Sequence, residues 1–179
     1  MALLSKFLSN WRFSLIGPYI RGNVLDIGFG QGRIFKLYRA RMEKYYGVEL
    51  NPKLVERLSN DFPEAVFVQH DLDNESLKIQ ETFDTVLMLA VVEHVWNQKL
   101  FFEEVIRHIK KDGKIIITTP TPFGNDWIHV IGSWLGLFAQ SAADDHIVIY
   151  NKKRFRILAE EFNLRIIVYK RFQIFCINL

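Results

Sequence analysis

The chain has 179 residues, of which 49% are hydrophobic and 24% are charged. This composition is typical of a globular protein with one domain over residues 1–179, and it excludes an intrinsically disordered chain. The formal net charge of +3 decides little, because Lys and Arg are scattered among acids. The sequence therefore predicts no nucleic-acid partner.

The N-terminal residues 1–20 are predicted to form a helix that covers the domain. Their apolar side chains recur at helical spacing, at Leu4, Phe7, Leu8, Trp11 and Leu15. Lys6 and Arg12 interrupt them, so we expect no secretory signal. The single cysteine, Cys176, has apolar neighbours and cannot form an internal disulfide. We therefore expect a soluble protein of the reducing cytoplasm.

Strands and helices are predicted to alternate through the first two thirds of the chain. The predicted strands are the apolar runs 24–27, 45–50, 65–69, 85–89 and 114–119. Predicted helices lie at 33–38, from Pro52 to 58 with Asn51 as its cap, and at 99–110, which Asp112-Gly113 ends. This alternation implies right-handed crossovers and a parallel sheet covered on both faces.

The C-terminal part departs from the alternation. Asn151 is predicted to cap a helix through Phe162, and strands are predicted at 164–170 and 173–177. So short a link as Arg171-Phe172 permits only an antiparallel hairpin. The predicted fold class is α/β, a Rossmann-like three-layer αβα sandwich. Its seven-stranded, mostly parallel sheet ends in an antiparallel strand.

A glycine-rich turn follows the first predicted strand. Gly28, Gly30 and Gly32 let the backbone bend sharply and approach a ligand with no Cβ in the way. Glu49 ends the second strand 21 residues after Gly28, a spacing that brings a carboxylate onto ribose hydroxyls in a βαβ unit. The turn and Glu49 therefore predict a site beyond the carboxyl ends of the strands. The alternative is a structural corner with a solvent-facing acid.

The glycine spacing argues against a dinucleotide. A dinucleotide fingerprint has two residues between its second and third glycines, whereas only Gln31 separates Gly30 from Gly32. Asp26, just before the turn, would repel a pyrophosphate but suits a cationic ligand. An NAD-dependent oxidoreductase is therefore the weaker alternative.

The segment from Val24 to Gly32, VLDIGFGQG, resembles the glycine-rich motif of class I S-adenosylmethionine-dependent methyltransferases, especially their broad small-molecule group. The resemblance covers nearly the whole chain, since residues 91–95, residues 111–114 and the terminal hairpin are also similar to that family. It implies an enzyme that uses S-adenosylmethionine to methylate a small acceptor and releases S-adenosylhomocysteine. A non-catalytic S-adenosylmethionine-binding module is an alternative.

The resemblance also implies which residues hold the cofactor. Asp26 and the turn would hold the methionine end, and Glu49 the ribose. Asp71 and Leu72 would contact the adenine, unless Asp71 only caps the next turn. The full predicted set is Asp26, Gly28, Phe29, Gly30, Gly32, Glu49, Leu50, Asp71, Leu72, Leu89 and Ala90. Ala90 replaces an acid with which some polyprenyl-benzoate O-methyltransferases hold a metal, so no metal site is predicted.

Three residues are candidate catalytic bases, namely His94, His146 and Tyr150. His146 follows Asp144-Asp145, and neighbouring acids raise the pKa of a histidine toward a range useful for a base. Each candidate also has an ordinary reading, as a packed or solvated polar side chain. Because the sulfonium leaving group is already activated, the sequence needs no catalytic triad for methyl transfer.

The apolar segment 121–146 is predicted to be an insertion after the fifth strand. Its wide apolar face is formed by Trp127, Ile128, Ile131, Trp134, Leu135 and Phe138. The segment could pack on the sheet, form a lid over a hydrophobic acceptor, or place Trp127 and Trp134 against a membrane surface. The sequence leaves these three alternatives open.

A methyltransferase for nucleic-acid bases is the weaker enzyme alternative. An enzyme of that type acting on an exocyclic amine is expected to carry an Asn/Asp-Pro-Pro-aromatic element after the fourth strand. Residues 89–92 are Leu-Ala-Val-Val instead. The chain also lacks a clustered basic stripe that would bind phosphates.

Overall fold

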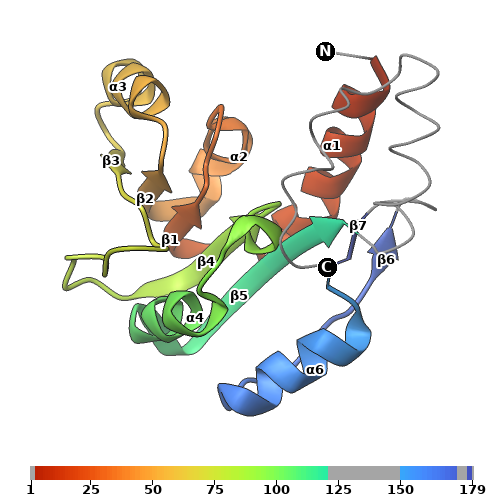
Figure 1. Cartoon of the computed structure of the whole chain (residues 1–179). Coiled ribbons are helices and arrows are strands. Elements are labelled where there is room, and N and C mark those ends of the chain that lie inside the picture. The colour runs from red at the N-terminus through yellow and green to blue at the C-terminus, as the bar shows by residue number, and fades with distance from the viewer. Residues whose placement is uncertain (1–2, 121–149, 173–176, 179) are drawn as a thin grey trace. The chain divides into compact units, whose positions relative to one another are not determined.

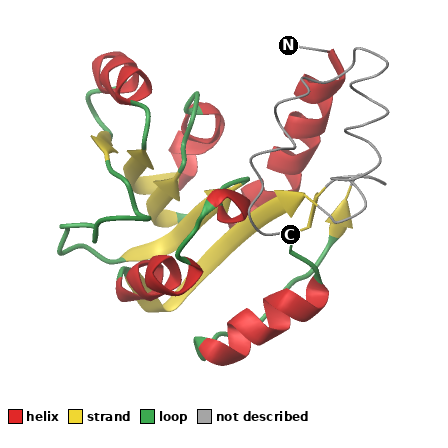
Figure 2. Cartoon of the chain, viewed as in Figure 1, coloured by secondary structure: helices red, strands yellow, loops and turns green. Residues whose placement is uncertain are grey.

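The computed structural model describes residues 3–120, 150–172 and 177–178. Figure 1 labels its helices and strands and colours them along the chain, and Figure 2 distinguishes helices from strands by colour. Their bounds are α1 Leu3–Ile16, η1 Gly17–Tyr19, β1 Gly22–Ile27, α2 Arg33–Tyr38, η2 Arg39–Arg41, β2 Met42–Glu49, α3 Pro52–Asp61, β3 Val66–Gln69, β4 Phe83–Leu89, η3 Val92–His94, α4 Gln98–Arg107, β5 Ile109–Pro120, α6 Lys152–Glu161, β6 Arg171–Phe172 and β7 Ile177–Asn178, where η marks a 3-10 helix.

The chain divides into two compact units. The first, which we call the sheet unit, comprises Ile16–Leu89 and Asn97–Ile116. The second, the terminal unit, comprises Met1–Leu15, Ala90–Trp96 and Ile117–Leu179. A single domain over the whole chain stays a prediction.

The sheet unit is built on a parallel sheet, as the sequence predicts. β1 pairs in parallel with β2 and with β4, and β2 pairs in parallel with β3. The strand order in this unit is β3-β2-β1-β4-β5. The order reverses direction at β1, and right-handed crossovers on its two sides place their helices on opposite faces of the sheet. Ligands bind at such a reversal, beyond the carboxyl ends of the strands.

Burial explains why the central strands form. The last four residues of β1 are buried, and β4 is buried at five of its seven positions. A strand covered on both faces carries a continuous apolar run instead of an alternating one. This is the pattern from which both strands were predicted.

Asparagine side chains cap three of the predicted helices, α3, α4 and α6, and two of these caps, Asn51 and Asn151, were predicted. The Asn51 side chain accepts a hydrogen bond from the Lys53 N–H, with Pro52 in the first turn of α3. The Asn151 side chain accepts one from the Arg154 N–H at the start of α6. Both predicted caps are thus confirmed. Such caps can be predicted from sequence because they need only a local side-chain acceptor.

The boundary between α4 and β5 differs from the sequence prediction. α4 ends at Arg107, and β5 already begins at Ile109, so Asp112-Gly113 lies inside the strand instead of ending the helix. The chain leaves the helix at His108, whose carbonyl accepts the Phe83 N–H at 2.9 Å. This bond to the first residue of β4 outweighs the local helix signal of residues 108–110.

The predicted C-terminal hairpin is present but shifted. β6 consists of Arg171–Phe172, the residues predicted to be the link, and it pairs antiparallel with β7. β7 also pairs antiparallel with Thr119 and Pro120 of β5. Residues 164–170 are not a strand, and Ile167 is 65% exposed. β-branched residues favour a strand only where a partner strand and a covered face are present.

The predicted N-terminal helix is present as α1, and its role as a cover stays a prediction. The segment 121–146, with Trp127 and Trp134, lies outside the described residues, as do His146 and Cys176.

Candidate functional site

The glycine turn begins at the carboxyl end of β1. The Gly28 N–H donates to the carbonyl of Val48 at 2.8 Å, which extends the pairing of β1 with β2 before the chain bends. Gly28, Gly30 and Gly32 have φ angles of 71°, 54° and 66°. A side chain is strained at such angles, so glycine is favoured at all three positions.

Two glycines of the turn have different surroundings. A Cβ on Gly32 would lie 2.7 Å from Cδ1 of Leu58 in α3. A Cβ on Gly30 would have none of the described atoms within 4 Å. Gly32 is therefore required for packing, whereas the position beside Gly30 is open to a ligand.

Glu49 joins the glycine turn to the start of α3. Its Oε2 accepts a hydrogen bond from the Gly30 N–H at 3.0 Å, and its Oε1 accepts one from the Asn51 N–H at 3.1 Å. A carboxylate has about four acceptor positions, so each oxygen can still accept another bond. The side chain is half-buried. Glu49, the residue predicted to bind the ribose, thus lies against Gly30, and its oxygens can still accept hydrogen bonds from a diol.

Asp26 lies on β1 just before the turn, and its side chain is buried. The Tyr45 hydroxyl donates a hydrogen bond to its Oδ2 at 2.7 Å. Burial raises the pKa of Asp26 to about 7; the Tyr45 hydrogen bond opposes this rise and the Glu49 charge adds to it. Asp26 therefore changes charge near neutral pH, and a nearby cation would favour its ionised form.

Gly47, which the sequence analysis did not single out, makes room for Phe29. It pairs with Asp26 across the sheet, and a Cβ there would lie 2.7 Å from Cδ1 of Phe29. Phe29 is buried and meets Phe67 edge to face, with ring centroids 5.1 Å apart. The Phe29 ring therefore belongs to the core, and a ligand at the turn would meet its backbone. A glycine inside a strand is the signal that points to such close packing.

Asp71 caps the turn that follows β3. Its Oδ1 accepts a hydrogen bond from the Asp73 N–H at 3.0 Å, and its Oδ2 accepts one from the Asn74 side chain at 2.8 Å. These bonds match the capping alternative that the sequence left open. A contact of Asp71 with adenine stays a prediction.

The predicted apolar contacts differ in exposure. Leu72 is buried, Leu89 is half-buried, and Leu50 is 60% exposed. Leu50 and Leu89 therefore offer apolar surface to a ligand, whereas Leu72 offers chiefly its backbone, as the resemblance implies.

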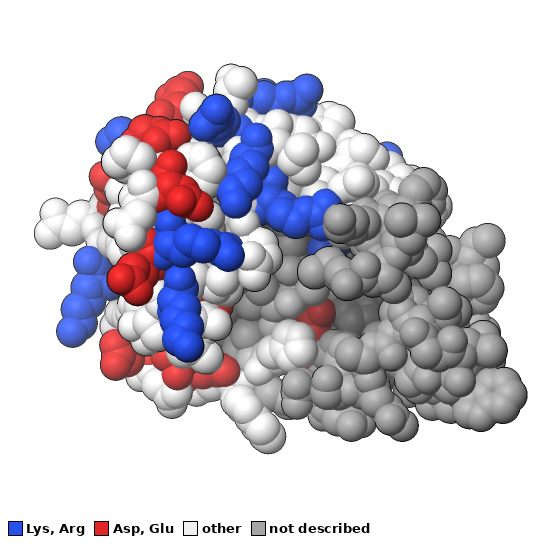
Figure 3. All heavy atoms as spheres, turned by 90° about the horizontal axis from the view of Figure 1, so that it is seen from above, with Lys and Arg blue, Asp and Glu red and all other residues white. Residues whose placement is uncertain are grey.

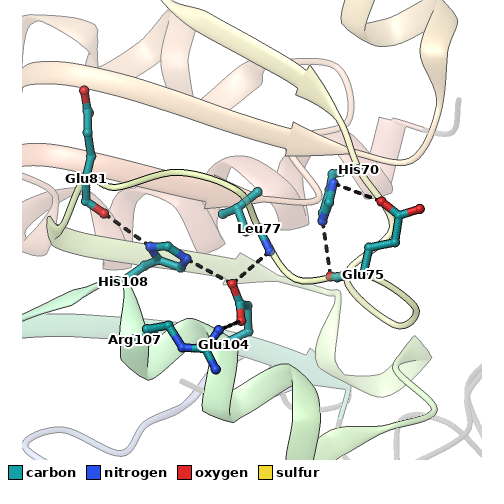
Figure 4. Close-up of polar contacts among 7 residues, drawn as sticks. All are labelled: His70, Glu75, Leu77, Glu81, Glu104, Arg107 and His108. Carbon is teal, nitrogen blue, oxygen red and sulfur yellow. Dashed lines mark hydrogen bonds and ion pairs between the residues drawn. The ribbon is translucent and has the colours of Figure 1, made fainter.

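A buried carboxylate holds the loop between Asp71 and β4. Oε1 of Glu104 in α4 accepts a hydrogen bond from the Leu77 N–H at 2.8 Å and lies 3.0 Å from Nε2 of His108 (Figure 4). Nδ1 of His108 lies 3.2 Å from the carbonyl of Glu81, near the far end of the loop. The loop that starts at the predicted adenine contact is thus held at two points.

We expect Glu104→Ala to destabilise the protein by about 1–3 kcal/mol, because the buried Leu77 N–H loses its acceptor. Glu103→Ala is the matched control on the same helix, since the interaction of Glu103 within the described part of the chain is an exposed pair with Lys99. That change should alter the unfolding free energy by less than about 0.5 kcal/mol. Thermal unfolding compares the two variants, and equal stabilities would contradict the anchoring role of Glu104.

The candidate bases differ in their surroundings. His94 is an exposed residue at the end of η3. Tyr150 is buried and stacks on Phe155, with ring centroids 4.9 Å apart. Burial raises the pKa of Tyr150 to about 12, so its hydroxyl is protonated at neutral pH and suits a hydrogen-bond donor better than a base. The catalytic roles of His94, Tyr150 and His146 stay predictions.

Ala90 directly follows β4 and has a φ angle of 60°, a conformation uncommon for residues other than glycine. Its N–H donates to the carbonyl of Thr118 at 2.7 Å, which joins the start of the 90–96 loop to β5. Ala90 belongs to the terminal unit, and the predicted contact of Ala90 with the cofactor stays a prediction.

Within 3–120, 150–172 and 177–178, no three His, Cys, Asp or Glu residues lie close enough together to bind a metal ion. None of the helices described is long and apolar enough to cross a membrane. On the face shown in Figure 3, acidic side chains lie next to basic ones. One exposed pair, Arg39 and Glu64, has its charged atoms 3.6 Å apart. In the coloured part of that view, the acidic side chains beside the basic ones oppose the attraction of a polyanion.

Sequence comparison finds methyltransferases. The chain is 30% identical over 98 residues to a ubiquinone biosynthesis O-methyltransferase of Rickettsia felis, covering 54% of this chain and 40% of that protein. It is 26% identical over 98 residues to a probable S-adenosylmethionine-dependent methyltransferase of Mycobacterium tuberculosis, covering 55% of this chain and 35% of that protein. The chain thus matches two fifths or less of the length of these relatives.

Structural comparison finds the same fold in solved proteins. The YcgJ protein of Bacillus subtilis superimposes with a TM-score of 0.68 at 18% identity, over 92% of this chain and 71% of that one. Magnesium protoporphyrin IX methyltransferase of Synechocystis, solved with bound S-adenosylhomocysteine, also has a TM-score of 0.68, at 14% identity over 97% of this chain and 80% of that one. The predicted Rossmann-like fold is therefore confirmed.

A family model described as a methyltransferase domain matches residues 10–168, which include the glycine turn, Glu49 and the loops after β3 and β4. The chain therefore belongs to the methyltransferase-domain family.

Proposed function

We propose that this domain binds S-adenosylmethionine and transfers its methyl group to a small, hydrophobic acceptor. One observation carries the proposal. Glu49 accepts a hydrogen bond from the Gly30 N–H and can accept more, and the space beside Gly30, where a side chain would begin, holds no described atom within 4 Å. A ribose diol requires such acceptors next to a backbone that it can approach closely. The methyltransferase relatives support the same ligand.

The residues at the ends of β1, β2 and β3 fit the parts of this ligand. Glu49 would accept from the ribose hydroxyls, and the backbone at Leu72 would meet the adenine. Buried Asp26 would favour the cationic methionine end through its charge. No metal ion is needed for this arrangement.

S-adenosylmethionine, when bound, supplies a sulfonium methyl group that an acceptor atom displaces in line. The work of the chain is then to align the acceptor and exclude water, which supplies roughly 7–11 kcal/mol in favourable systems. An acceptor that must lose its proton also needs a base, for which His94 and His146 remain the candidates. The raised pKa of Tyr150 favours a donor role in holding the acceptor.

The names of the relatives support a small acceptor. One is named for ubiquinone biosynthesis and another for magnesium protoporphyrin IX. The proposal transfers from them the class of substrate and not its identity, because one fold serves many acceptors.

Two measurements test the proposal. Calorimetric titration with S-adenosylmethionine and, separately, with NAD should show micromolar binding of the first and none of the second. Incubation with methyl-labelled S-adenosylmethionine and a metabolite extract should then yield labelled products of low molecular weight. Tight binding without any labelled product would indicate a non-catalytic binding module, and binding of NAD alone would overturn the proposal.

We expect the affinity for S-adenosylmethionine to rise about tenfold from pH 6 to pH 8. The ionised form of Asp26, whose pKa is about 7, prefers the cationic ligand, and the ionised fraction increases over this range. Asp26→Asn keeps the shape and the Tyr45 hydrogen bond, so its affinity should change far less with pH. Adenosine lacks the charged end and is the ligand control. An identical pH profile for the wild type and Asp26→Asn would contradict this role.

The same ionisation predicts how stability depends on pH without a ligand. Folding raises the pKa of Asp26 above its usual value of 3.8, so between about pH 4 and 7 the folded state binds more protons than the unfolded state. Its contribution to stability is therefore full below pH 4 and is lost as pH rises through 7. Relative to the wild type, Asp26→Asn should become more stable over this range when unfolding is measured by denaturant.

A further inference from the structure

Glu93 is a second buried carboxylate, and it has no described partner. It lies in η3, directly after the β4 strand and the Ala90 turn, and its side chain is 1% exposed. Neither Oε1 nor Oε2 makes a hydrogen bond to any of the described residues. Buried carboxylates in folded proteins are nearly always paired, because an unpaired one costs stability. Glu93 therefore needs an explanation other than packing.

Thr119 adds a second unpartnered group beside Glu93. Its side chain is fully buried, and its Oγ1 likewise makes no hydrogen bond within the described part of the chain. The Thr119 hydroxyl nevertheless lies beside the Glu93 carboxylate, because it opposes, as a donor would, the rise in the pKa of Glu93 that burial causes. Thr118 has an unpartnered hydroxyl too, but successive strand residues point to opposite faces, so the Thr118 hydroxyl lies on the other face of β5.

Charged and polar neighbours surround the pair. Arg12 and His94 both act to lower the pKa of Glu93, and the Glu93 charge helps to raise the pKa of Tyr150. All five residues belong to the terminal unit. Glu93 follows the carboxyl end of β4, and Thr119 lies near the carboxyl end of β5. Ligands of this fold bind beyond such strand ends, and the proposed cofactor contacts come mainly from β1, β2 and β3.

We propose that Glu93 and Thr119 form the polar part of the acceptor site, where they accept hydrogen bonds from a hydroxyl or amine group of the acceptor. This inference rests on the proposed methyltransferase function and adds to it a class of acceptor, one that carries an O–H or N–H donor. A carboxylate only accepts hydrogen bonds when ionised, so a group without a donor cannot satisfy it. A metal ion fits less well, since no third His, Cys, Asp or Glu ligand accompanies Glu93 and His94 among the residues described.

If Glu93 serves the acceptor and not the fold, removing its charge should stabilise the protein. Neither Glu93 oxygen has a hydrogen-bond partner among the described residues, so replacing this buried carboxylate with an apolar group of similar size removes a cost. Glu93→Leu should therefore raise the melting temperature by about 3 °C or more. Glu104→Leu is the matched control, because Glu104 is also buried but both of its oxygens have partners, and it should lower the melting temperature. Melting of Glu93→Leu below the wild type would show that Glu93 has a structural partner and would overturn the proposal.

Small aromatic probes test recognition in the full chain saturated with S-adenosylhomocysteine. Phenol and benzylamine carry the donor, and anisole is the matched probe without one; ligand-observed NMR measures their dissociation constants. Phenol or benzylamine should bind at least tenfold more tightly than anisole, and Glu93→Leu and Thr119→Val should abolish that preference while S-adenosylhomocysteine affinity stays within twofold. Equal binding of all three probes, or a preference that survives both substitutions, would overturn the inference. If the wild type does not bind S-adenosylhomocysteine at all, the proposed function itself is refuted.

Discussion

Replacing Glu49 by alanine should weaken S-adenosylmethionine binding at least 100-fold while the protein stays folded. Two ribose hydroxyls would lose bonds to a charged acceptor, each worth about 1.5–3 kcal/mol, and about 1.4 kcal/mol corresponds to a tenfold change in affinity. The change also removes the acceptor of the Gly30 and Asn51 N–H groups. Because Glu49 is only half-buried, water can replace those bonds, so stability should fall by about 1 kcal/mol or less.

Two control variants separate these effects. Glu49→Gln keeps the length and one acceptor oxygen, so its affinity should lie between those of the wild type and Glu49→Ala. Glu64→Ala removes an exposed acid that pairs with Arg39, and it should change neither affinity nor stability appreciably. Calorimetry measures affinity, and circular dichroism shows that each variant is folded. A folded Glu49→Ala variant with wild-type affinity would remove Glu49 from the proposed site.

Gly30→Ala should chiefly weaken ligand binding, whereas Gly32→Ala should chiefly destabilise the protein. Both glycines have φ angles between 54° and 66°, so either substitution costs roughly 1–2 kcal/mol of backbone strain. At Gly32 the new Cβ also lies 2.7 Å from Leu58, and this overpacking adds about 1–3 kcal/mol. At Gly30 the methyl group meets no described atom within 4 Å and instead fills the space proposed for the ligand.

Gly32→Ala should therefore be the less stable variant, and Gly30→Ala the one whose affinity falls by tenfold or more at a modest loss of stability. Thermal unfolding and calorimetric titration of both variants give the comparison. Each variant serves as the control for the other, because the backbone strain is shared. Wild-type affinity in Gly30→Ala would mean that the open position beside Gly30 is not where the ligand lies.

Local signals in the sequence are enough to predict the part of the fold that carries the proposed cofactor contacts, from β1 to α3. The run 24–27 is apolar because β1 is covered on both faces, and the glycines that follow it are needed for positive φ angles. Asn51 and Asn151 cap their helices through bonds that span two or three residues. The position of Glu49 at the end of β2 follows from the same local pattern.

Features that depend on distant contacts could not be predicted in this way. The start of β5 is set by the pairing of His108 with Phe83, and residues 164–170 lack a partner strand despite their β-branched side chains. Asp26 was already identified, but its burial, which raises its pKa to about 7, and the opposing hydrogen bond from Tyr45, 19 residues away, depend on the packing of the fold. Glu93 was recognised only as part of a motif, because the lack of a partner for a buried carboxylate is visible only in three dimensions.

The most direct test of the account is a crystal structure of the chain with S-adenosylhomocysteine. We predict electron density for the nucleoside over the turn at Gly30, with both ribose hydroxyl oxygens within about 3.2 Å of the Glu49 carboxylate. A ligand bound at another face of the sheet unit, or a ribose that does not contact Glu49, would contradict the central claim.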